Sequence, residues 1–364
     1  MRHPGKPQRG LTRRQALMAA IPALGGLAGG ASAQPEVRRL RGAGSTFAAP
    51  LYIAMSEKLG RAGSFELDYA SVGSGEGVRR IIERQVDFGA TDRPMARREL
   101  EERGLLQLPT AIGGVVVTAN LPGVKVGRLR LSSEVLADLF LGRIASWNDA
   151  RLRALNPGIA LPALAVSPLH REESSGTSYL FSNYLDRTSP AWKSSIGVKS
   201  QLVLPRGQAV RGNGGMARAV SQQPGALGYL EYSYAQDNGL PMMNLRNRFG
   251  EFVSPSAQSI SAAVVAADWE LLFLDPKPTF EIDTIDAAGP RCWPIVGMTY
   301  VVAPTSWADA GRAAAFVQFV EALYAEGGVA IKTGENYVPL PSRARNLARV
   351  TMRVHLNPAR RIAR

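Results

Sequence analysis

The chain has 364 residues, of which 45% are hydrophobic and 20% are charged, a composition typical of a soluble globular protein of two domains. Its net charge is +13, but residues 1–33 carry +5 and residues 341–364 carry +7, which leaves +1 for the body of the chain. Because the basic residues lie at the two ends rather than over one folded face, the charge pattern excludes binding to DNA or RNA.

The N-terminus has the pattern of an export signal. Arg13 and Arg14 precede a weakly apolar stretch at residues 17–30, and Ala31-Ser32-Ala33 forms a cleavage motif. The apolar stretch is too short and too rich in glycine to span a bilayer stably, so a membrane anchor is the weaker interpretation. We expect residues 1–33 to be a twin-arginine-type signal peptide and the mature chain to be free in the periplasm, without a lipid anchor.

Cysteine and histidine are scarce. Cys292 is the only cysteine, so it cannot form an internal disulfide, and its apolar neighbours indicate a small buried side chain. The histidines are His3, His170 and His355, and we therefore expect neither a transition-metal site nor a cofactor.

The body of the chain begins with two glycine-rich turns, each ahead of a predicted helix. The first turn leads into a helix at residues 48–59, which places the hydroxyl of Thr46 and the amide of Phe47 at the helix start. A strand at residues 65–72 leads into the second turn, G-S-G-E-G, which contains Ser74. Since this motif lacks the Rossmann spacing and no Walker lysine follows, it does not indicate nucleotide binding.

A short buried strand at residues 86–91 ends in a polar turn that carries Asp92. Open α/β sheets bind ligands at the carboxyl ends of their strands, which makes Asp92 a candidate ligand. A charged helix at residues 96–106 and a long apolar strand at residues 109–120 follow. The pair Gly113-Gly114 would let that strand bend between domains.

The densest polar motif is H-R-E-E-S-S-G-T-S-Y at residues 170–179. Ser175 fits the N-cap of a helix whose first amides lack partners, and the cation Arg171 lies four residues before it. Hydroxyls, amides and a guanidinium that converge on one point form a receptor for a small tetrahedral oxyanion. On this motif alone, a capped helix start without any ligand is the stronger interpretation. Taken together with the other segments, an oxyanion-binding site becomes the stronger one.

The rest of the middle region reads as scaffold. Residues 131–149 hold two helical turns and Trp147, most simply a core aromatic. Residues 206–218 are either a wall of a cleft or a plain loop before a helix at residues 216–222. Residues 227–234 are predicted to be a strand whose tyrosines pack.

The C-terminal part begins with a loop at residues 275–294, followed by an apolar strand at residues 296–303 and a helix at residues 313–324. The basic segment at residues 343–364 begins with an amphipathic pattern made by Leu347, Val350 and Val354. A solvated tail is the favoured interpretation of this segment, ahead of contact with an anionic membrane surface or a permease.

Seven segments stand in the order and approximate spacing of one family. They are G-A-G-S-T-F, V-G-S-G-E-G-V, V-D-F-G-A-T-D-R-P, I-G-G-V-V, L-F-L-G-R-I-A-S-W-N-D, R-E-E-S-S-G-T-S and Q-Q-P-G-A-L-G-Y-L-E-Y. In this order the chain resembles the phosphate-binding proteins of phosphate-specific ABC importers, from Arg41 to about Leu356. Each motif is weak alone, but seven in order are a strong signal.

The resemblance implies a type II periplasmic binding protein fold of the α/β class, with two lobes joined by two crossing hinge strands. Lobe 1 would comprise residues 38–120 and 296–356, lobe 2 residues 121–295, and residues 357–364 would form a basic tail. The ligand would lie in the cleft between the lobes.

The resemblance also implies a set of phosphate contacts. They are Thr46, Phe47, Ser74, Asp92, Arg171, Ser175, Gly176 and Thr177. Glu173 stands where the family commonly has aspartate and would pair with Arg171. Ser174 replaces the usual glycine, and His170 replaces a residue that is often arginine and fits the rim of the site better than a ligand.

The hydrogen-bonding properties of Asp92 explain how such a site would select phosphate. Phosphate near pH 7 keeps at least one O–H, whereas ionised Asp92 can only accept hydrogen bonds. Sulfate would bring an oxygen lone pair against this carboxylate. An unmet buried acceptor costs about 1–3 kcal/mol, which corresponds to a discrimination of at least ~10- to 100-fold.

We therefore expect a non-catalytic monomer that captures inorganic phosphate, with a dissociation constant of about 1 μM or tighter. It would deliver phosphate by lobe closure to an inner-membrane ABC permease and its ATPase subunits. One alternative is the same fold tuned to sulfate, molybdate or arsenate, or acting as a phosphate sensor. A hydrolase using Ser175 or Ser74 is disfavoured, because only His170 could serve as base and no G-x-S-x-G elbow exists.

Overall fold

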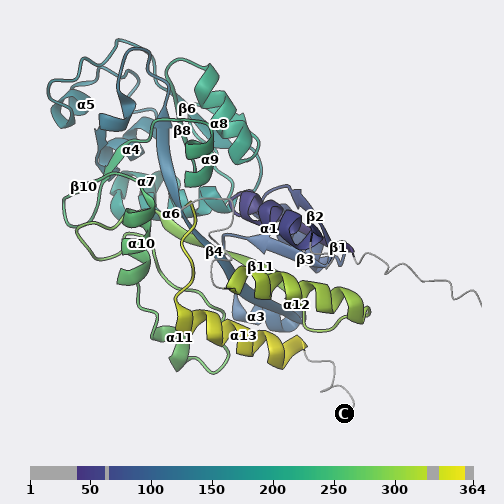
Figure 1. Ribbon diagram of the computed structural model, residues 1–364. Helices are drawn as coiled ribbons and strands as arrows, with labels where there is room; N and C mark the ends of the chain where they lie inside the picture. Colours follow the sequence, from purple (N-terminus) through teal and green to yellow (C-terminus); the bar gives the residue numbers. More distant parts are fainter. Residues whose placement is uncertain (1–38, 62–64, 326–335, 357–364) are drawn as a thin grey trace, which may run out of the picture. The chain divides into compact units, whose positions relative to one another are not determined.

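The computed structural model describes residues 39–61, 65–325 and 336–356, so the predicted signal peptide and the tail at residues 357–364 lie outside the described residues. The main sheet has eight strands in the order β2-β1-β3-β11-β4-β8-β6-β7 (Figure 1). Its strands are β1 (Arg39–Gly44), β2 (Glu66–Ser71), β3 (Phe88–Thr91), β4 (Leu105–Ala119), β6 (Ser167–Arg171), β7 (Gln208–Val210), β8 (Ala226–Glu231) and β11 (Val296–Pro304). A second sheet contains β5 (Arg130–Leu131), β9 (Asn244–Arg246) and β10 (Phe252–Val253).

The two longest strands, β4 and β11, lie in the middle of the main sheet and run antiparallel to each other. Both are buried along their whole length, as expected for strands that are apolar on both faces. On one side β1 pairs in parallel with β2 and β3; on the other β6 pairs in parallel with β7 and β8. The central pair therefore joins two sets of parallel strands.

Strand β4 changes its partner halfway along. Its first part, up to Gly114, pairs with β11, and its last five residues pair with β8. A Cβ on Gly113 would lie 2.9 Å from the ring of Phe47, and one on Gly114 would lie 2.8 Å from the side chain of Ile260. Close packing thus demands glycine at the predicted bending point.

Helices cover both sets of strands. Against β1, β2 and β3 pack α1 (Ala49–Arg61), α2 (Ser74–Ile82) and α12 (Ala310–Tyr324), whereas α3 (Arg97–Glu102) and α13 (Ser342–Leu356) pack against β4. The chain between β4 and β11 supplies η1 (Val126–Arg128), α4 (Ser133–Phe140), α5 (Ala150–Leu155), α6 (Gly176–Thr188), α7 (Pro190–Ser195), α8 (Gly212–Gln222), α9 (Tyr232–Asp237), α10 (Ala257–Ala266) and α11 (Leu271–Leu274). The predicted two-lobe α/β fold class is confirmed.

Aromatic side chains fill the core on each side of the central strands. On one side the ring of Phe88 stacks on Phe319 with centroids 5.4 Å apart, and on the other Phe181 stacks on Tyr229 at 4.2 Å. Trp147 is fully buried and donates its indole N–H to the carbonyl of Gly225 at 3.1 Å, as its interpretation as a core aromatic predicts. Cys292 is also buried.

Three predicted boundaries are wrong. Strand β8 ends at Glu231, because the Glu231 carboxylate accepts the amide of Ser233 and caps α9, so Tyr232 and Tyr234 are helical. Helix α3 ends at Glu102, and Leu105 already belongs to β4. Helix α8 begins at Gly212 rather than Met216, which places the glycine-rich stretch inside its first turn.

The segment interpreted as a solvated tail is instead largely a packed helix. In α13 the buried face is made of Ala344, Ala348, Met352 and Leu356. Of the three side chains of the predicted apolar face, Leu347 is partly buried against the core, whereas Val350 and Val354 are exposed. The four-residue spacing of Ala344, Ala348 and Met352 therefore defines the buried face of α13, although larger hydrophobic side chains lie on another face.

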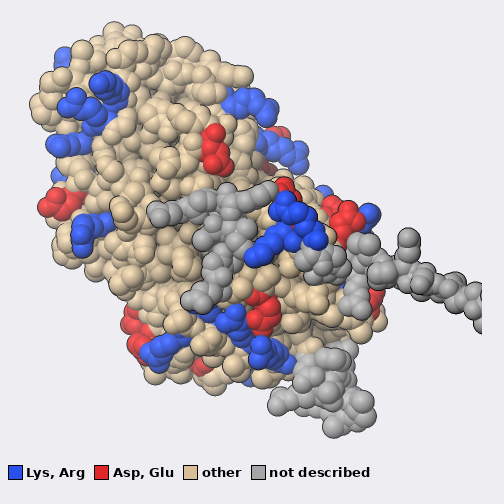
Figure 2. Space-filling model, viewed as in Figure 1, with Lys and Arg blue, Asp and Glu red and all other residues tan. Residues whose placement is uncertain are grey.

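Charged side chains show no single basic surface on the face seen in Figure 2. Lys and Arg lie in small groups, several of them next to acidic side chains. Many are ion-paired, for example Arg79 with Glu76 at 2.7 Å and Arg349 with Glu321 at 2.7 Å. On this face the basic side chains are therefore mixed with acidic ones rather than gathered in one patch.

Candidate functional site

The eight predicted site residues come together where strands end and helices begin. Thr46 and Phe47 lie between β1 and α1, Ser74 opens α2, and Asp92 follows β3. The remaining four lie at the end of β6 and the start of α6; they are Arg171, Ser175, Gly176 and Thr177. All eight are buried. Carboxyl ends of strands and amino ends of helices thus converge, as in other open α/β sites for anions.

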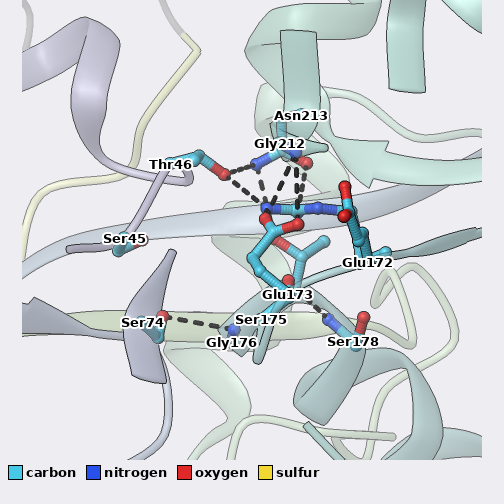
Figure 3. A network of polar contacts seen from close by, with 12 residues as sticks. Ser45, Thr46, Ser74, Glu172, Glu173, Ser175, Gly176, Ser178, Gly212 and Asn213 are labelled. Carbon is cyan, nitrogen blue, oxygen red and sulfur yellow. Dashed lines mark hydrogen bonds and ion pairs between the residues drawn. The ribbon is translucent and has the colours of Figure 1, made fainter. Parts of the chain in front are cut away.

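Hydrogen bonds join residues of the two predicted lobes, for example Ser74 and Gly176 (Figure 3). Arg171 Nη2 donates to Thr46 Oγ1 at 3.1 Å, and the Gly176 amide donates to Ser74 Oγ at 3.2 Å. Ser74 Oγ in turn donates to Asp92 Oδ2 at 3.3 Å. These bonds form two groups, one around Arg171 and Thr46 and one around Ser74 and Asp92. Together with the residues bonded to them, we call the two groups the polar network.

Asp92 is the acceptor of this network, with 2% of its surface exposed. Its Oδ1 accepts hydrogen bonds from Ser45 Oγ at 2.5 Å and from Thr299 Oγ1 at 2.6 Å. Burial raises the pKa of Asp92 to about 6, while these hydroxyls and the charge of Arg171 oppose the rise. Asp92 is consequently mainly ionised above pH 6 and can accept a hydrogen bond from an O–H group of a ligand.

Arg171 is the cation of the network, with 1% exposure. Its Nη2 pairs with the carboxylate of Glu173, and its Nη1 donates to Asn213 Oδ1 at 3.4 Å. Its Nε is buried and has no hydrogen-bond partner among the described residues. A buried guanidinium with an unused donor favours an additional anionic or polar partner at this place.

Glu173 contacts both Arg171 and the start of α8. The amide of Gly212, at the start of α8, donates to Glu173 Oε1 at 3.2 Å. His170 is half-buried, and its Nδ1 lies 3.3 Å from the carbonyl oxygen of Arg171, outside the polar network. The Ser174 carbonyl accepts the Gly75 amide at 3.0 Å, so this loop touches the start of α2.

Glycine is required at two places in the site. Gly73 has a φ of 97°, and a Cβ there would lie 2.6 Å from Glu173 Cγ. A Cβ on Gly176 would lie 2.3 Å from Asp92 Oδ2. The amino end of α6 can therefore approach the carboxylate only because residue 176 has no side chain.

Several predicted phosphate donors have protein partners in this structure. The Phe47 amide donates to Ser45 Oγ at 3.0 Å, and Ser175 Oγ accepts the Ser178 amide at 3.2 Å as the N-cap of α6. Thr177 Oγ1 accepts from Asn213 Nδ2 at 3.4 Å. The hydroxyl of Ser175 thus has a capping role in addition to its proposed contact with the ligand.

Three residues of the network were not predicted from the sequence: Ser45, Asn213 and Thr299. Ser45 stands inside the G-A-G-S-T-F motif next to Thr46, so its position was a usable signal. Asn213 donates to Thr46 Oγ1 at 2.9 Å, so the first turn of α8 reaches the polar network. Thr299 is a single polar residue in an apolar strand and carried no signal of its own.

Metal chemistry is not indicated by the side chains. Within residues 39–61, 65–325 and 336–356, no group of three or more His, Cys, Asp or Glu side chains could hold a metal ion.

Comparisons of the sequence agree with each other. A sequence model described as a PBP superfamily domain matches residues 29–321. The phosphate-binding protein PstS of Xylella fastidiosa (strain Temecula1) is 37% identical over 308 residues, which cover 85% of this chain and 83% of that protein. The phosphate-binding protein PstS of Pasteurella multocida (strain Pm70) is 37% identical over 306 residues, 84% of this chain and 87% of that protein.

Solved structures share the fold at lower sequence identity. A high affinity periplasmic phosphate-binding protein, PfluDING, solved at subatomic resolution with bound phosphate at pH 8.5, superposes with a TM-score of 0.70. It is 21% identical, and the match covers 86% of this chain and 93% of the other. This similarity supports the two-lobe arrangement described above.

Proposed function

Because the chain belongs to the PBP superfamily and, within it, to the family of PstS phosphate-binding proteins, we propose that it captures inorganic phosphate for an ABC importer. The observation that carries the proposal is the buried carboxylate of Asp92 among hydroxyl and amide donors. Phosphate offers such an acceptor a proton near pH 7, and a fully ionised anion does not.

The proposed phosphate contacts are the eight residues of the buried network. The guanidinium of Arg171, the amides of Phe47 and Gly176 and the hydroxyls would donate to the phosphate oxygens. Asp92 would accept the remaining phosphate O–H. One full cation, already paired with Glu173, leaves most of the anion's charge to neutral dipoles. Such a site holds the ligand without water and still releases it when the lobes open.

Lobe closure would deliver the ligand. We place lobe 1 at residues 38–120 and 296–356 and lobe 2 at residues 121–295, with β4 and β11 as the hinge strands. The contacts of Thr46 with Arg171 and Asn213 and of Ser74 with Gly176 cross this boundary, and they support a closed arrangement around the site. The partner would be an inner-membrane permease with its ATPase subunits, and the protein itself would be a non-catalytic monomer.

The proposed location is the periplasm. The pair Arg13-Arg14, the weakly apolar stretch and the cleavage motif support export through a twin-arginine-type signal, with residues 34–364 as the mature chain.

Calorimetric titration of the mature chain tests this function. The protein is unfolded, dialysed free of small ions and refolded, then titrated at pH 8 with phosphate, arsenate and sulfate. We expect one phosphate site with a dissociation constant of about 1 μM or tighter. Sulfate should bind at least ~10- to 100-fold more weakly. Absence of phosphate binding, or equal affinity for sulfate, would refute the proposal.

A further inference from the structure

Thr299 contacts the carboxylate that would distinguish phosphate from sulfate. It lies on β11 and is fully buried, and its Oγ1 donates to Asp92 Oδ1 at 2.6 Å. Ser45 Oγ donates to the same oxygen at 2.5 Å. The other oxygen, Oδ2, accepts only the longer hydrogen bond from Ser74 Oγ at 3.3 Å among the described residues. The two oxygens of the carboxylate thus have different surroundings.

The hydroxyl groups of Ser45 and Thr299 both direct their protons at Oδ1. Ser45 Oγ accepts the Phe47 amide at 3.0 Å, so its own proton points to Asp92. Two donors on one carboxylate oxygen stabilise the ionised form, because hydrogen bonds to a charged acceptor are stronger than those to a neutral one. Oδ2, which accepts one long bond from Ser74, is therefore the oxygen that can still accept the O–H of a ligand.

We propose that Thr299, acting with Ser45, is a positioning residue that sets anion selectivity by holding Asp92 with Oδ2 presented to the ligand. This inference rests on the proposed function.

The position of Thr299 explains why it can do this before the lobes close. Its carbonyl accepts Thr110 Oγ1 at 3.1 Å, and the register of β11 against β4 shifts directly after it, between Thr299 and Tyr300. Thr299, Ser45 and Ser74 all belong to the segments proposed as lobe 1, as does Asp92. The acceptor would thus be oriented in one lobe alone, ready for a ligand that arrives in the open cleft.

Most of the titratable groups around Asp92 are neutral tyrosines. Burial raises the pKa of each neighbouring tyrosine; these are Tyr52, Tyr69, Tyr234, Tyr300 and Tyr337. A cavity of about 240 Å³ reaches Asp92 and is lined by three further charged side chains, Arg187, Glu281 and Asp283. The charge of Arg171 and the hydroxyls of Ser45, Thr299 and Ser74 are what hold the pKa of Asp92 down against burial.

Thr299→Val removes the hydroxyl at nearly constant volume, and Thr299→Ser keeps it. The parent and both variants are stripped of ligand and titrated with phosphate and with sulfate between pH 5 and pH 8.5. In the valine variant the pKa of Asp92 should rise. Because only ionised Asp92 selects phosphate over sulfate, the selectivity should be lost at a higher pH than in the parent. At pH 7 the ratio of phosphate to sulfate affinity should fall at least ~10-fold. The serine variant should follow the parent.

Two further variants separate selectivity from general destabilisation. Ser45→Ala should shift the same ratio in the same direction and keeps the test decisive if Thr299→Val does not fold. Thr118→Val removes a fully buried hydroxyl of β4 that donates to the Pro241 carbonyl and contacts neither Asp92 nor Thr299, and it should leave the ratio unchanged.

The outcomes distinguish this inference from the function on which it rests. If the parent does not bind phosphate, the proposed function itself fails. If the parent binds phosphate and Thr299→Val and Ser45→Ala retain its selectivity and pH profile, only the positioning role is overturned.

Discussion

Two buried carboxylates, Asp92 and Glu231, differ in what surrounds them. Burial raises the pKa of Asp92 to about 6 and that of Glu231 to about 8. Hydroxyl donors and the charge of Arg171 oppose the rise at Asp92. Glu231 is bonded by Ser233, and its buried Oε1 has no hydrogen-bond partner among the residues that the structure describes. Near neutral pH Asp92 is therefore mainly ionised and Glu231 mainly protonated, so only Asp92 can serve as an anionic acceptor.

Replacement of Asp92 by asparagine tests the acceptor role. The amide can donate to a sulfate oxygen, so Asp92→Asn should lower the ratio of phosphate to sulfate affinity at least ~10-fold in calorimetric titrations at pH 8. Asp87→Asn is the matched control, because Asp87 is also buried but accepts the Arg41 amide away from the site. An unchanged ratio in Asp92→Asn would contradict the assignment.

Removal of Arg171 tests the cation. A buried charge-assisted contact predicts that Arg171→Ala lowers phosphate affinity by at least ~2 kcal/mol, which is about 30-fold. Arg39→Ala serves as control, since Arg39 is exposed and pairs only with Glu66 at the far edge of the sheet. Phosphate affinity in Arg171→Ala within about threefold of the parent would remove this residue from the site.

At the scale of elements, the site is made by the start of α6 meeting the end of β3. Gly176 opens α6, and its backbone comes so close to Asp92 Oδ2 that a Cβ would lie 2.3 Å away. This contact brings the helix amides and the positive end of the helix dipole next to the ligand position.

Alanine at position 176 should therefore damage binding. Gly176→Ala must displace either Asp92 or the start of α6, and we expect at least a ~10-fold loss of phosphate affinity. Gly215→Ala in α8 is the control, because its added Cβ would meet no heavy atom within 4 Å. That change should raise stability slightly, by about 0.5–1 kcal/mol, and leave phosphate affinity as it is. Equal phosphate affinity in both variants would refute the close approach of α6.

Elements with strong local patterns could be predicted, and those decided by distant contacts could not. The apolar strands β4 and β11 and the capped helix α6 followed from periodicity and from Ser175. Helix α9 was missed because its start depends on the cap made by Glu231. For α13 the amphipathic pattern was recognised but its packing was not, because half of its buried face is alanine, Ala344 and Ala348.

The same distinction holds in the site. The order of the motifs placed Asp92 and Arg171, but Thr299 reaches Asp92 across 207 residues of sequence and Asn213 reaches Thr46 across 167. A polar residue in an apolar strand does not reveal its partner until the strands are paired. Sequence reasoning therefore found the residues proposed to face the ligand and missed those that hold them.

At the scale of the whole molecule, one sheet passes through both lobes. Strand β4 pairs with β11 and then with β8, and Gly113 and Gly114 stand at the change of partner. Glu231, the residue of β8 opposite Val115, lies at this junction, and its Oε1 would be 3.2 Å from a Cβ on Gly113. A protonated carboxyl group is thus built into the centre of the proposed hinge.

This carboxyl group should make the protein's stability depend on pH. Its folded pKa of about 8 lies above the usual glutamate pKa of 4.5, so its contribution is fully present below pH 4.5 and is lost as pH rises towards 8. Between pH 5.5 and pH 8 the parent should lose up to ~3 kcal/mol more unfolding free energy than Glu231→Gln. Urea unfolding without phosphate measures this difference; parallel curves for the two proteins would show that Glu231 is ionised in the fold.

The most direct test of the central claim is a crystal structure of the mature protein with phosphate at pH 8. We predict one phosphate oxygen at about 2.5–2.7 Å from Asp92 Oδ2, with Oδ1 still bonded to Ser45 and Thr299. A carboxylate turned away from the bound ion, with no oxygen of the ligand within hydrogen-bonding distance, would contradict the account.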